Sequence, residues 1–286
     1  MENQVVNIKS MSIDQIKKAI GQDTGSENKN NIPRLSINRN PDDEQGNTLP
    51  VGSFVVYDPS LNENVYGKPV TVRPFISAMQ YMHFEPEKGE YVNRSIIFKN
   101  WKEEALDILG GTKCGKLPYK DRDKLSPEVL SEQRKIRCYK LIYGLISFKG
   151  KLAKGTDHAI ENLPIIWRVT GTSYNPVTEA IESISQRNKL MYACTLTVDT
   201  KRQKKGGNTF YTPDIKVNTE ANLKLTEDDL ATIQVFQESI TKENNEVVAL
   251  WKAAKDKKYT NGDASSAKLV EQLDAEESDP VEIFKS

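Results

Sequence analysis

Residues 190–217 read LMYACTLTVDTKRQKKGGNTFYTPDIKV. Two runs rich in β-branched and aromatic residues, 190–199 and 209–217, flank a polar connection that contains two adjacent glycines. This pattern is typical of a β-hairpin whose turn needs the backbone freedom of glycine. The stretch therefore predicts two paired strands, with four cations that project from the connection between them: Lys201, Arg202, Lys204 and Lys205.

Strand-like segments recur upstream of this hairpin, and turn residues separate them. Their period-2 or continuous apolar patterns predict further strands over residues 54–57, 70–75, 78–84, 91–98, 138–148 and 164–170. The loop 85–90, EPEKGE, is polar and contains proline and glycine, so it predicts pairing between the two segments beside it. A β-meander is the simplest arrangement of these strands.

Four segments have helical patterns. Residues 101–109 place apolar side chains on one side before Gly110-Gly111, and Ser126-Pro127-Glu128 is a typical helix start. Helical spacing of apolar residues also predicts helices over 174–184 and from Thr226 to about residue 257. The chain is therefore expected to be mainly β with α, an α+β fold that ends in a long helix.

Composition divides the 286 residues into three parts. We expect a flexible N-terminal arm over 1–30, one elaborated domain over 31–258, and a disordered acidic tail over 259–286. No apolar run reaches the length of a membrane span, and the start of the sequence does not resemble a secretory signal. Three widely spaced cysteines argue against a disulfide framework and suit a reduced cytoplasm.

Charge is balanced over the whole chain but segregated along it, since 40 Lys and Arg residues match 40 Asp and Glu residues. Between residues 113 and 149 there are ten basic and four acidic residues, whereas residues 271–286 contain six acidic residues and one basic residue. This segregation predicts a cationic surface together with an anionic tail.

Motifs for catalysis are weak. The two histidines, His83 and His158, are far apart in sequence and from the cysteines, so we expect no metal site and no cofactor. Residues 110–116 match the GxxxxGK part of a phosphate-binding loop, but Leu117 stands where a Ser or Thr would hold magnesium. A non-enzymatic protein is therefore expected, while a nuclease, which would need clustered acids for magnesium, remains a rival that incubation with labelled DNA and divalent metal would test.

A surface that binds single-stranded nucleic acid needs cations for phosphates and rings on which bases stack. In residues 134–143 neither face of the expected strand is purely apolar, because Arg137, Tyr139 and Tyr143 alternate with Lys140. Such a strand is not expected in a core. The candidate contacts are the four hairpin cations above together with residues from three upstream segments: Arg73, Arg94, Lys99, Arg134, Lys135, Arg137, Tyr139, Lys140 and Tyr143.

The run from Leu163 to Trp251 resembles the second half of bacteriophage single-stranded DNA-binding proteins. The resemblance rests on residues 162–172, NLPIIWRVTGT, on 189–192, KLMY, on the basic hairpin with 210–213, FYTP, and on the final helix. It implies an oligonucleotide/oligosaccharide-binding (OB) fold, a five-stranded Greek-key barrel that serves DNA replication, recombination and repair.

The acidic tail extends this resemblance, since strand-coating proteins of replication recruit partner enzymes through an acidic tail with a terminal aromatic residue. Here Lys285 and Ser286 follow that aromatic residue. The expected partners are single-stranded DNA and replication or recombination proteins, and the alternatives are a solubilising tail and a virion or replisome scaffold. Whether the chain forms homo-oligomers stays open. The tail residues expected to bind partners are Asp274, Glu276, Glu277, Asp279, Glu282 and Phe284.

Overall fold

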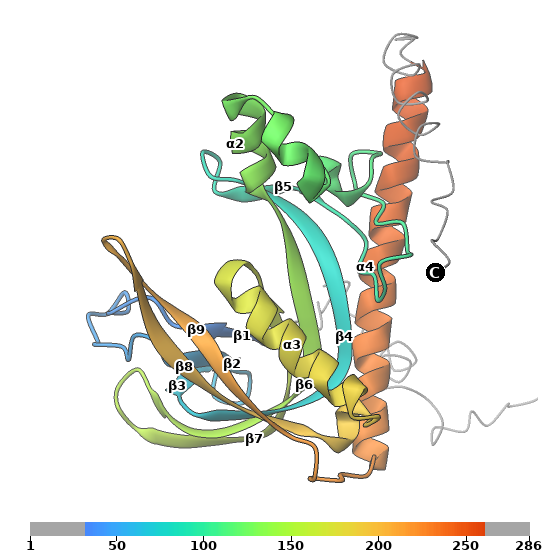
Figure 1. Cartoon of the computed structure of the whole chain (residues 1–286). Coiled ribbons are helices and arrows are strands. Elements are labelled where there is room, and N and C mark those ends of the chain that lie inside the picture. Colours follow the sequence, from blue (N-terminus) through green and yellow to red (C-terminus); the bar gives the residue numbers. More distant parts are fainter. Residues whose placement is uncertain (1–31, 261–286) are drawn as a thin grey trace, which may run out of the picture. The chain divides into compact units, whose positions relative to one another are not determined.

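The computed structural model describes residues 32–260, apart from the side chains of residues 121–123 and 258–260. The expected arm, 1–30, and the tail residues 261–286 lie outside the described residues. Strands dominate the described part (Figure 1), in agreement with the expected α+β class. The strands are β1 (Arg34–Ile37), β2 (Phe54–Asp58), β3 (Glu63–Gly67), β4 (Val70–Glu85), β5 (Glu90–Arg94), β6 (Ile136–Leu152), β7 (Asp157–Val169), β8 (Thr195–Lys205) and β9 (Asn208–Asn218).

The helices lie between and after these strands. They are α2 (Pro127–Lys135), α3 (Tyr174–Gln186) and α4 (Glu227–Thr260), with short 3₁₀ turns η2 (Lys113–Gly115), η3 (Tyr119–Lys124), η4 (Gly171–Ser173) and η5 (Met191–Ala193). The Ser126 hydroxyl accepts a hydrogen bond from the Val129 amide and caps α2, as its sequence predicts.

One sheet contains all nine strands, and part of it closes on itself. Its order is β3-β2-β1-β7-β6-β4-β8-β9, with β5 paired to β4 and β3 paired additionally to β6. The β3–β6 pairing closes a ring of the five strands β1, β2, β3, β6 and β7, in which β1 runs parallel to β7. The main core includes Phe54, Val65, Ile146 and Trp167 from these strands, and α3 adds Val177, Ile181 and Ile184 to it.

The two longest strands, β4 and β6, are neighbours in the sheet and pair along most of their length. β4 pairs with β6 from Thr71–Ser147 to His83–Ile136, with one register shift between Pro74 and Ile76. The segments 70–75 and 78–84 thus belong to one strand, and the loop 86–89 connects β4 to β5 as predicted. Residues 140–146 of β6 are all buried, so the expectation that this strand lies outside the core is wrong.

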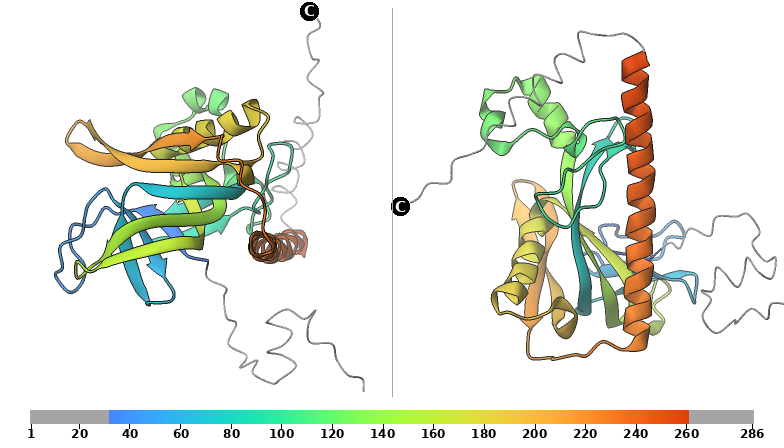
Figure 2. Two further views of the ribbon diagram at one scale, coloured as in Figure 1. Left: turned by 90° about the horizontal axis from the view of Figure 1, so that it is seen from below. Right: turned by 90° about the vertical axis from the view of Figure 1, so that its right-hand side faces the viewer.

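Helix α4 follows the two long strands along much of their length (Figures 1 and 2). A capping box starts it, because the Thr226 hydroxyl accepts a hydrogen bond from the Asp229 amide and the Asp229 carboxylate accepts one from the Thr226 amide. The predicted apolar stripe is buried at Phe236, Ile240 and Val247. No helix within residues 32–260 is both long enough and apolar enough to cross a bilayer.

Two predicted elements differ in the structure. Residues 101–109 form turns and isolated bridges rather than a helix, because the Asp107 carboxylate accepts amide hydrogen bonds from Leu109, Gly111 and Cys114 and shapes an irregular loop. The hairpin of residues 190–217 exists, but its connection is only Gly206-Gly207, so the four cations belong to the end of β8. Residues 191–193 form η5 instead of the start of β8.

Candidate nucleic-acid interface

A row of cations and rings crosses the outer face of the sheet over β1, β7 and β6. Arg34 of β1 pairs with Ile166 of β7. Arg168 lies two residues further along β7, so its side chain is on the same face as that of Arg34. Leu141 of β6 is opposite Arg168, so Tyr139 and Arg137 continue the row on that face. With Tyr91, whose hydroxyl is 3.1 Å from the Tyr139 hydroxyl, these residues form what we call the arginine–tyrosine cluster: Arg34, Tyr91, Arg137, Tyr139 and Arg168.

The charges of this cluster are incompletely compensated. The Arg168 guanidinium lies close enough to lower the pKa of Arg34, partial burial acts in the same direction, and Glu243 and Tyr91 oppose the shift. The Nε of Arg168 is buried and has no hydrogen-bond acceptor among the described residues. Arg34, Arg137 and Arg168 form no ion pair within the described part of the chain. An anion that bound here would relieve the repulsion between the two guanidinium groups.

Three rings lie next to these cations. Phe84 contacts Tyr91 edge to face at 5.1 Å between centroids, and Tyr91 contacts Tyr139 in the same way at 6.4 Å. Tyr91 is 49% exposed, which leaves ring surface available for a base. Burial and the Tyr91 hydroxyl raise the pKa of Tyr139, although Arg137 and Arg168 oppose the rise. The raised pKa keeps Tyr139 neutral at physiological pH, so its ring is uncharged beside the arginines.

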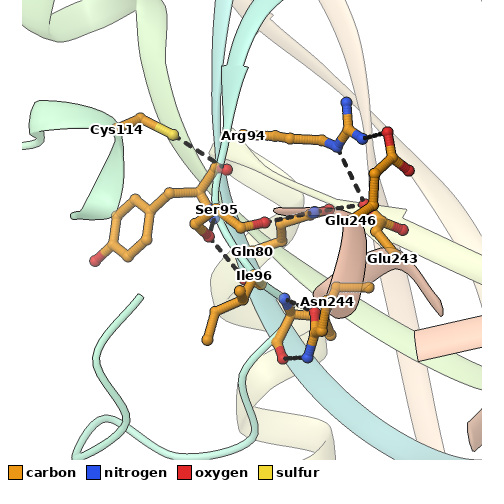
Figure 3. A network of polar contacts seen from close by, with 10 residues as sticks. Gln80, Arg94, Ser95, Ile96, Cys114, Glu243, Asn244 and Glu246 are labelled. Carbon is orange, nitrogen blue, oxygen red and sulfur yellow. Dashed lines mark hydrogen bonds and ion pairs between the residues drawn. The ribbon is translucent and has the colours of Figure 1, made fainter. Parts of the chain in front are cut away.

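Acidic side chains of α4 hold Arg94 (Figure 3). Glu246 accepts a 2.7 Å hydrogen bond from Arg94, and the Arg94 Nε lies 3.9 Å from Glu243. Glu243 also accepts a 2.7 Å hydrogen bond from Gln80, and Asn244 bonds both backbone groups of Ile97. Arg94, a predicted nucleic-acid contact, is thus held by carboxylates that compete with a phosphate for its guanidinium.

This competition predicts that Glu246→Gln tightens the binding of oligo-dT. The substitution releases the Arg94 guanidinium from an exposed ion pair, and a pair of this kind contributes about 0.2–1 kcal/mol, so the gain is about 1.4- to fivefold in affinity at low salt. Fluorescence anisotropy of labelled oligo-dT measures the change. Glu238→Gln, which removes an exposed carboxylate about two turns away on α4, is the matched control. Equal affinities of the two variants would contradict the role of Glu246.

The tip of the β8–β9 hairpin is a second cationic surface. Residues 201–209 are all exposed, and the Lys201 ammonium lies 2.8 Å from the Asp214 carboxylate on the partner strand. Arg202, Lys204 and Lys205 form no ion pair with any residue that the structure describes. Arg202 pairs with Tyr211 across the ladder and Lys204 with Thr209, so these two cations share one face. Three of the four predicted hairpin cations are therefore available to an anionic partner.

Four predicted contacts do not belong to an open surface. Tyr143 is 1% exposed because it packs on Phe236 of α4, and Lys140 is buried on the opposite face of β6. Arg73 donates to the carbonyls of Tyr192 and Lys224 and pairs with Asp229 at 2.9 Å. The Lys135 ammonium is held between Glu85 and Glu132 at 3.0 and 2.8 Å. The expectation that these four side chains lie on an open surface does not agree with the structure, because each is buried or held in ion pairs within the fold.

The other residues divide between the surface and the cluster. Lys99 and Arg134 are exposed, but neither belongs to the arginine–tyrosine cluster. Sequence reasoning missed Arg34 and Arg168, although Arg168 lies between the buried residues Trp167 and Val169 and alternation alone turns it outward. Arg34 carries no such signal, because its neighbour on β7 is 132 positions away in the sequence.

One group of side chains has the composition of a metal site. Ligand atoms of His83, Glu85 and Glu132 lie within 4.8 Å of one another, a grouping that the sequence does not reveal. The ammonium of Lys135 pairs with both carboxylates and offsets one of their two negative charges. We therefore interpret the group as an ion-pair network that joins α2 to the end of β4.

Comparison with protein-family models, with curated proteins and with solved structures finds no match for this chain. The resemblance of residues 163–251 to bacteriophage single-stranded DNA-binding proteins stays a prediction from the sequence pattern. The candidate interface depends on the charges, rings and exposure of its own residues.

Proposed function

We propose that this chain binds single-stranded DNA without regard to sequence and has no catalytic activity. The single observation that carries the proposal is the placement of Arg34 and Arg168 on one face of the paired strands β1 and β7, near the partly exposed rings of Tyr91 and Tyr139. Phosphates neutralise such cations, and any base can stack on such rings. A duplex keeps its bases stacked inside the helix, so the rings favour a single strand.

The topology of the closed ring of strands is also part of this proposal. We propose that the ring of β1, β2, β3, β6 and β7 is an OB-like Greek-key barrel, which the β3–β6 pairing and the parallel β1–β7 pairing support. β6 extends beyond the ring and places Arg137 and Tyr139 there, and β5, which pairs with the end of β4, adds Tyr91.

The biological setting follows from the resemblance. We propose that the protein coats single strands during bacteriophage replication, recombination and repair in the host cytoplasm. Its acidic tail then recruits partner proteins through Phe284 and the carboxylates before it. A scaffold protein of a virion or replisome is the alternative, and it would bind no DNA.

Equilibrium binding tests the proposal. Labelled oligo-dT of about 16 nucleotides, a mixed-sequence strand of equal length and the matching duplex are titrated with the full chain at about 50 and about 200 mM salt. We expect similar affinities for both single strands, weaker binding of the duplex, and a clear loss of affinity at the higher salt. Absence of binding at the lower salt would reject the function, and a preference for duplex would reject the role of the rings.

Substitution of the exposed ring gives a separate prediction. Tyr91→Ala is expected to weaken oligo-dT binding about tenfold, at the lower end of the 1–3 kcal/mol that a stacked base contributes, without changing the salt dependence. The same titration at both salt concentrations measures this. Tyr57→Ala, at another exposed tyrosine on β2, is the control, and equal affinity of the two variants would show that Tyr91 does not stack on a base.

A further inference from the structure

A hollow with lysines on its rim lies where the ring of strands closes. It is bordered by residues 50, 51 and 53 of the β1–β2 loop, by 66–68 at the end of β3, by 149–151 of β6, and by Asp157. β3 and β6 meet at its floor, where Tyr66 pairs with Lys151. We call this feature the lysine pocket and define it by Lys68, Lys149 and Lys151.

Two glycines line the pocket at positions where the surrounding chain packs too closely for a side chain. A Cβ at Gly67 would lie 2.7 Å from the ring of Phe148, and one at Gly150 would lie 2.5 Å from the carbonyl oxygen of Tyr66. Since neither position accepts a side chain, bare backbone lines the base of the hollow. Pro50 and the 39% exposed Val51 add an apolar wall. The bare backbone and the apolar wall can contact a sugar, and the ammonium groups can bind its phosphate.

The ammonium groups are loosely held. Lys68 lies 3.7 Å from Asp199, and Lys151 lies 3.5 Å from Asp157, with all four side chains well exposed. Lys149 has no ion pair with a described residue. Exposed pairs at such distances contribute little, so a phosphate can displace the aspartates at low cost. Three lysines against two aspartates leave one positive charge in excess.

The pocket adjoins the basic hairpin and shares a strand with the arginine–tyrosine cluster. Lys68 donates a hydrogen bond of 3.2 Å to Thr200, and the Thr200 hydroxyl donates to the Gly52 carbonyl, so the pocket lies at the base of the β8–β9 hairpin. Lys149 is ten residues from Tyr139 on β6, which corresponds to about 33 Å of extended strand. One long anion can therefore reach both sites.

We propose that the lysine pocket is a second binding site for phosphodiester groups, and that a single strand must span it and the arginine–tyrosine cluster to bind fully. The inference rests on the proposed function. A stacked strand rises about 3.4 Å per nucleotide along its axis, so about 4 nucleotides cover about 14 Å and reach only one site, whereas about 16 nucleotides cover about 54 Å and reach both. Linking two sites through one ligand raises affinity without any new contact.

The test compares two lengths of labelled oligo-dT, about 4 and about 16 nucleotides, on the full chain and on Lys149→Gln/Lys151→Gln. We expect the variant to weaken binding of the longer strand about tenfold and that of the shorter strand less than twofold. Lys149→Arg/Lys151→Arg should bind as the unchanged chain does. Circular dichroism confirms that each variant is folded.

The control is Lys216→Gln/Lys252→Gln, which removes two exposed lysines from β9 and α4. If this control and the pocket variant bind the longer strand equally, the lysine pocket is not a binding site, although the proposed function survives. If the unchanged chain binds neither strand at low salt, the proposed function itself fails. The two failures are therefore distinguishable.

Discussion

Arg34→Gln/Arg168→Gln is expected to weaken oligo-dT binding about 100-fold at low salt, the largest loss of affinity that we predict. Each arginine supplies a charge-assisted hydrogen bond to a phosphate, and such bonds contribute about 1.5–3 kcal/mol each. The logarithm of the binding constant should also fall less steeply with the logarithm of salt concentration. For single strands the slope changes by about 0.7 for each phosphate contact, so the loss of two contacts reduces it by about 1.4.

Anisotropy titrations over a series of salt concentrations measure both quantities. The charge-matched control, Lys216→Gln/Lys252→Gln, should keep nearly the full affinity, because those lysines lie outside the cluster. The unfolding temperature of the arginine variant should stay the same or rise, since the substitutions remove repulsion between neighbouring guanidinium groups. An unchanged salt slope would show that these arginines do not contact phosphates.

Asp229→Ala is expected to lower the free energy of unfolding by about 3 kcal/mol, the largest loss of stability that we predict. The Asp229 side chain is 6% exposed and pairs at 2.9 Å with Arg73, which is 14% exposed. Removal of one partner leaves the other charge buried and unpaired, which typically costs about 3–5 kcal/mol. The substitution also removes half of the capping box of α4. Urea denaturation followed by circular dichroism measures the loss.

The same pair makes stability depend on pH. Burial raises the pKa of Asp229, but the Thr226 hydrogen bonds and the Arg73 guanidinium outweigh it, so the pKa lies below its ordinary value of 3.8. A carboxyl with a lowered pKa stabilises the fold above the unfolded-state pKa and loses this effect as the pH falls through the folded-state pKa. The difference between the unchanged chain and Asp229→Ala should therefore be full near neutral pH and shrink below about pH 4. Asp228→Ala, at the exposed neighbour, should show neither effect; a difference that is the same at all pH values would argue against the ion pair.

Local signals in the sequence were enough for much of the fold. The glycine pair of the hairpin, the Ser126 and Thr226 caps and the apolar stripe of α4 all act within a few residues, and each predicted element exists. The prediction of a helix over 101–109 was wrong because the structure of this segment depends on one carboxylate, Asp107. Its hydrogen bonds to three amides follow from no periodicity in the sequence. The closure of the ring depends on pairings such as Val65–Leu152, which only the folded chain brings together.

The candidate site was harder to predict for the same reason. Tyr139 and Tyr143 are four residues apart on one face of β6 and look equivalent in the sequence. In the fold Phe236 of α4 covers Tyr143, whereas Tyr139 lies beyond that contact and reaches Tyr91. Arg34 becomes part of the site only because β1 pairs in parallel with β7. Residue type and alternation therefore suggest which side chains could bind a nucleic acid, but the packing of α4 decides which of them stay exposed.

Photochemical cross-linking of oligo-dT to the full chain, followed by mass spectrometry of the modified peptides, tests the central claim most directly. Ultraviolet light joins thymine to a side chain in contact with it, so the adduct reports where the bases lie. We predict adducts on Tyr91 and Tyr139, and their loss in Arg34→Gln/Arg168→Gln. Adducts confined to other parts of the chain, or none under conditions that cross-link a known single-strand binder, would contradict the claim that the arginine–tyrosine cluster holds single-stranded DNA.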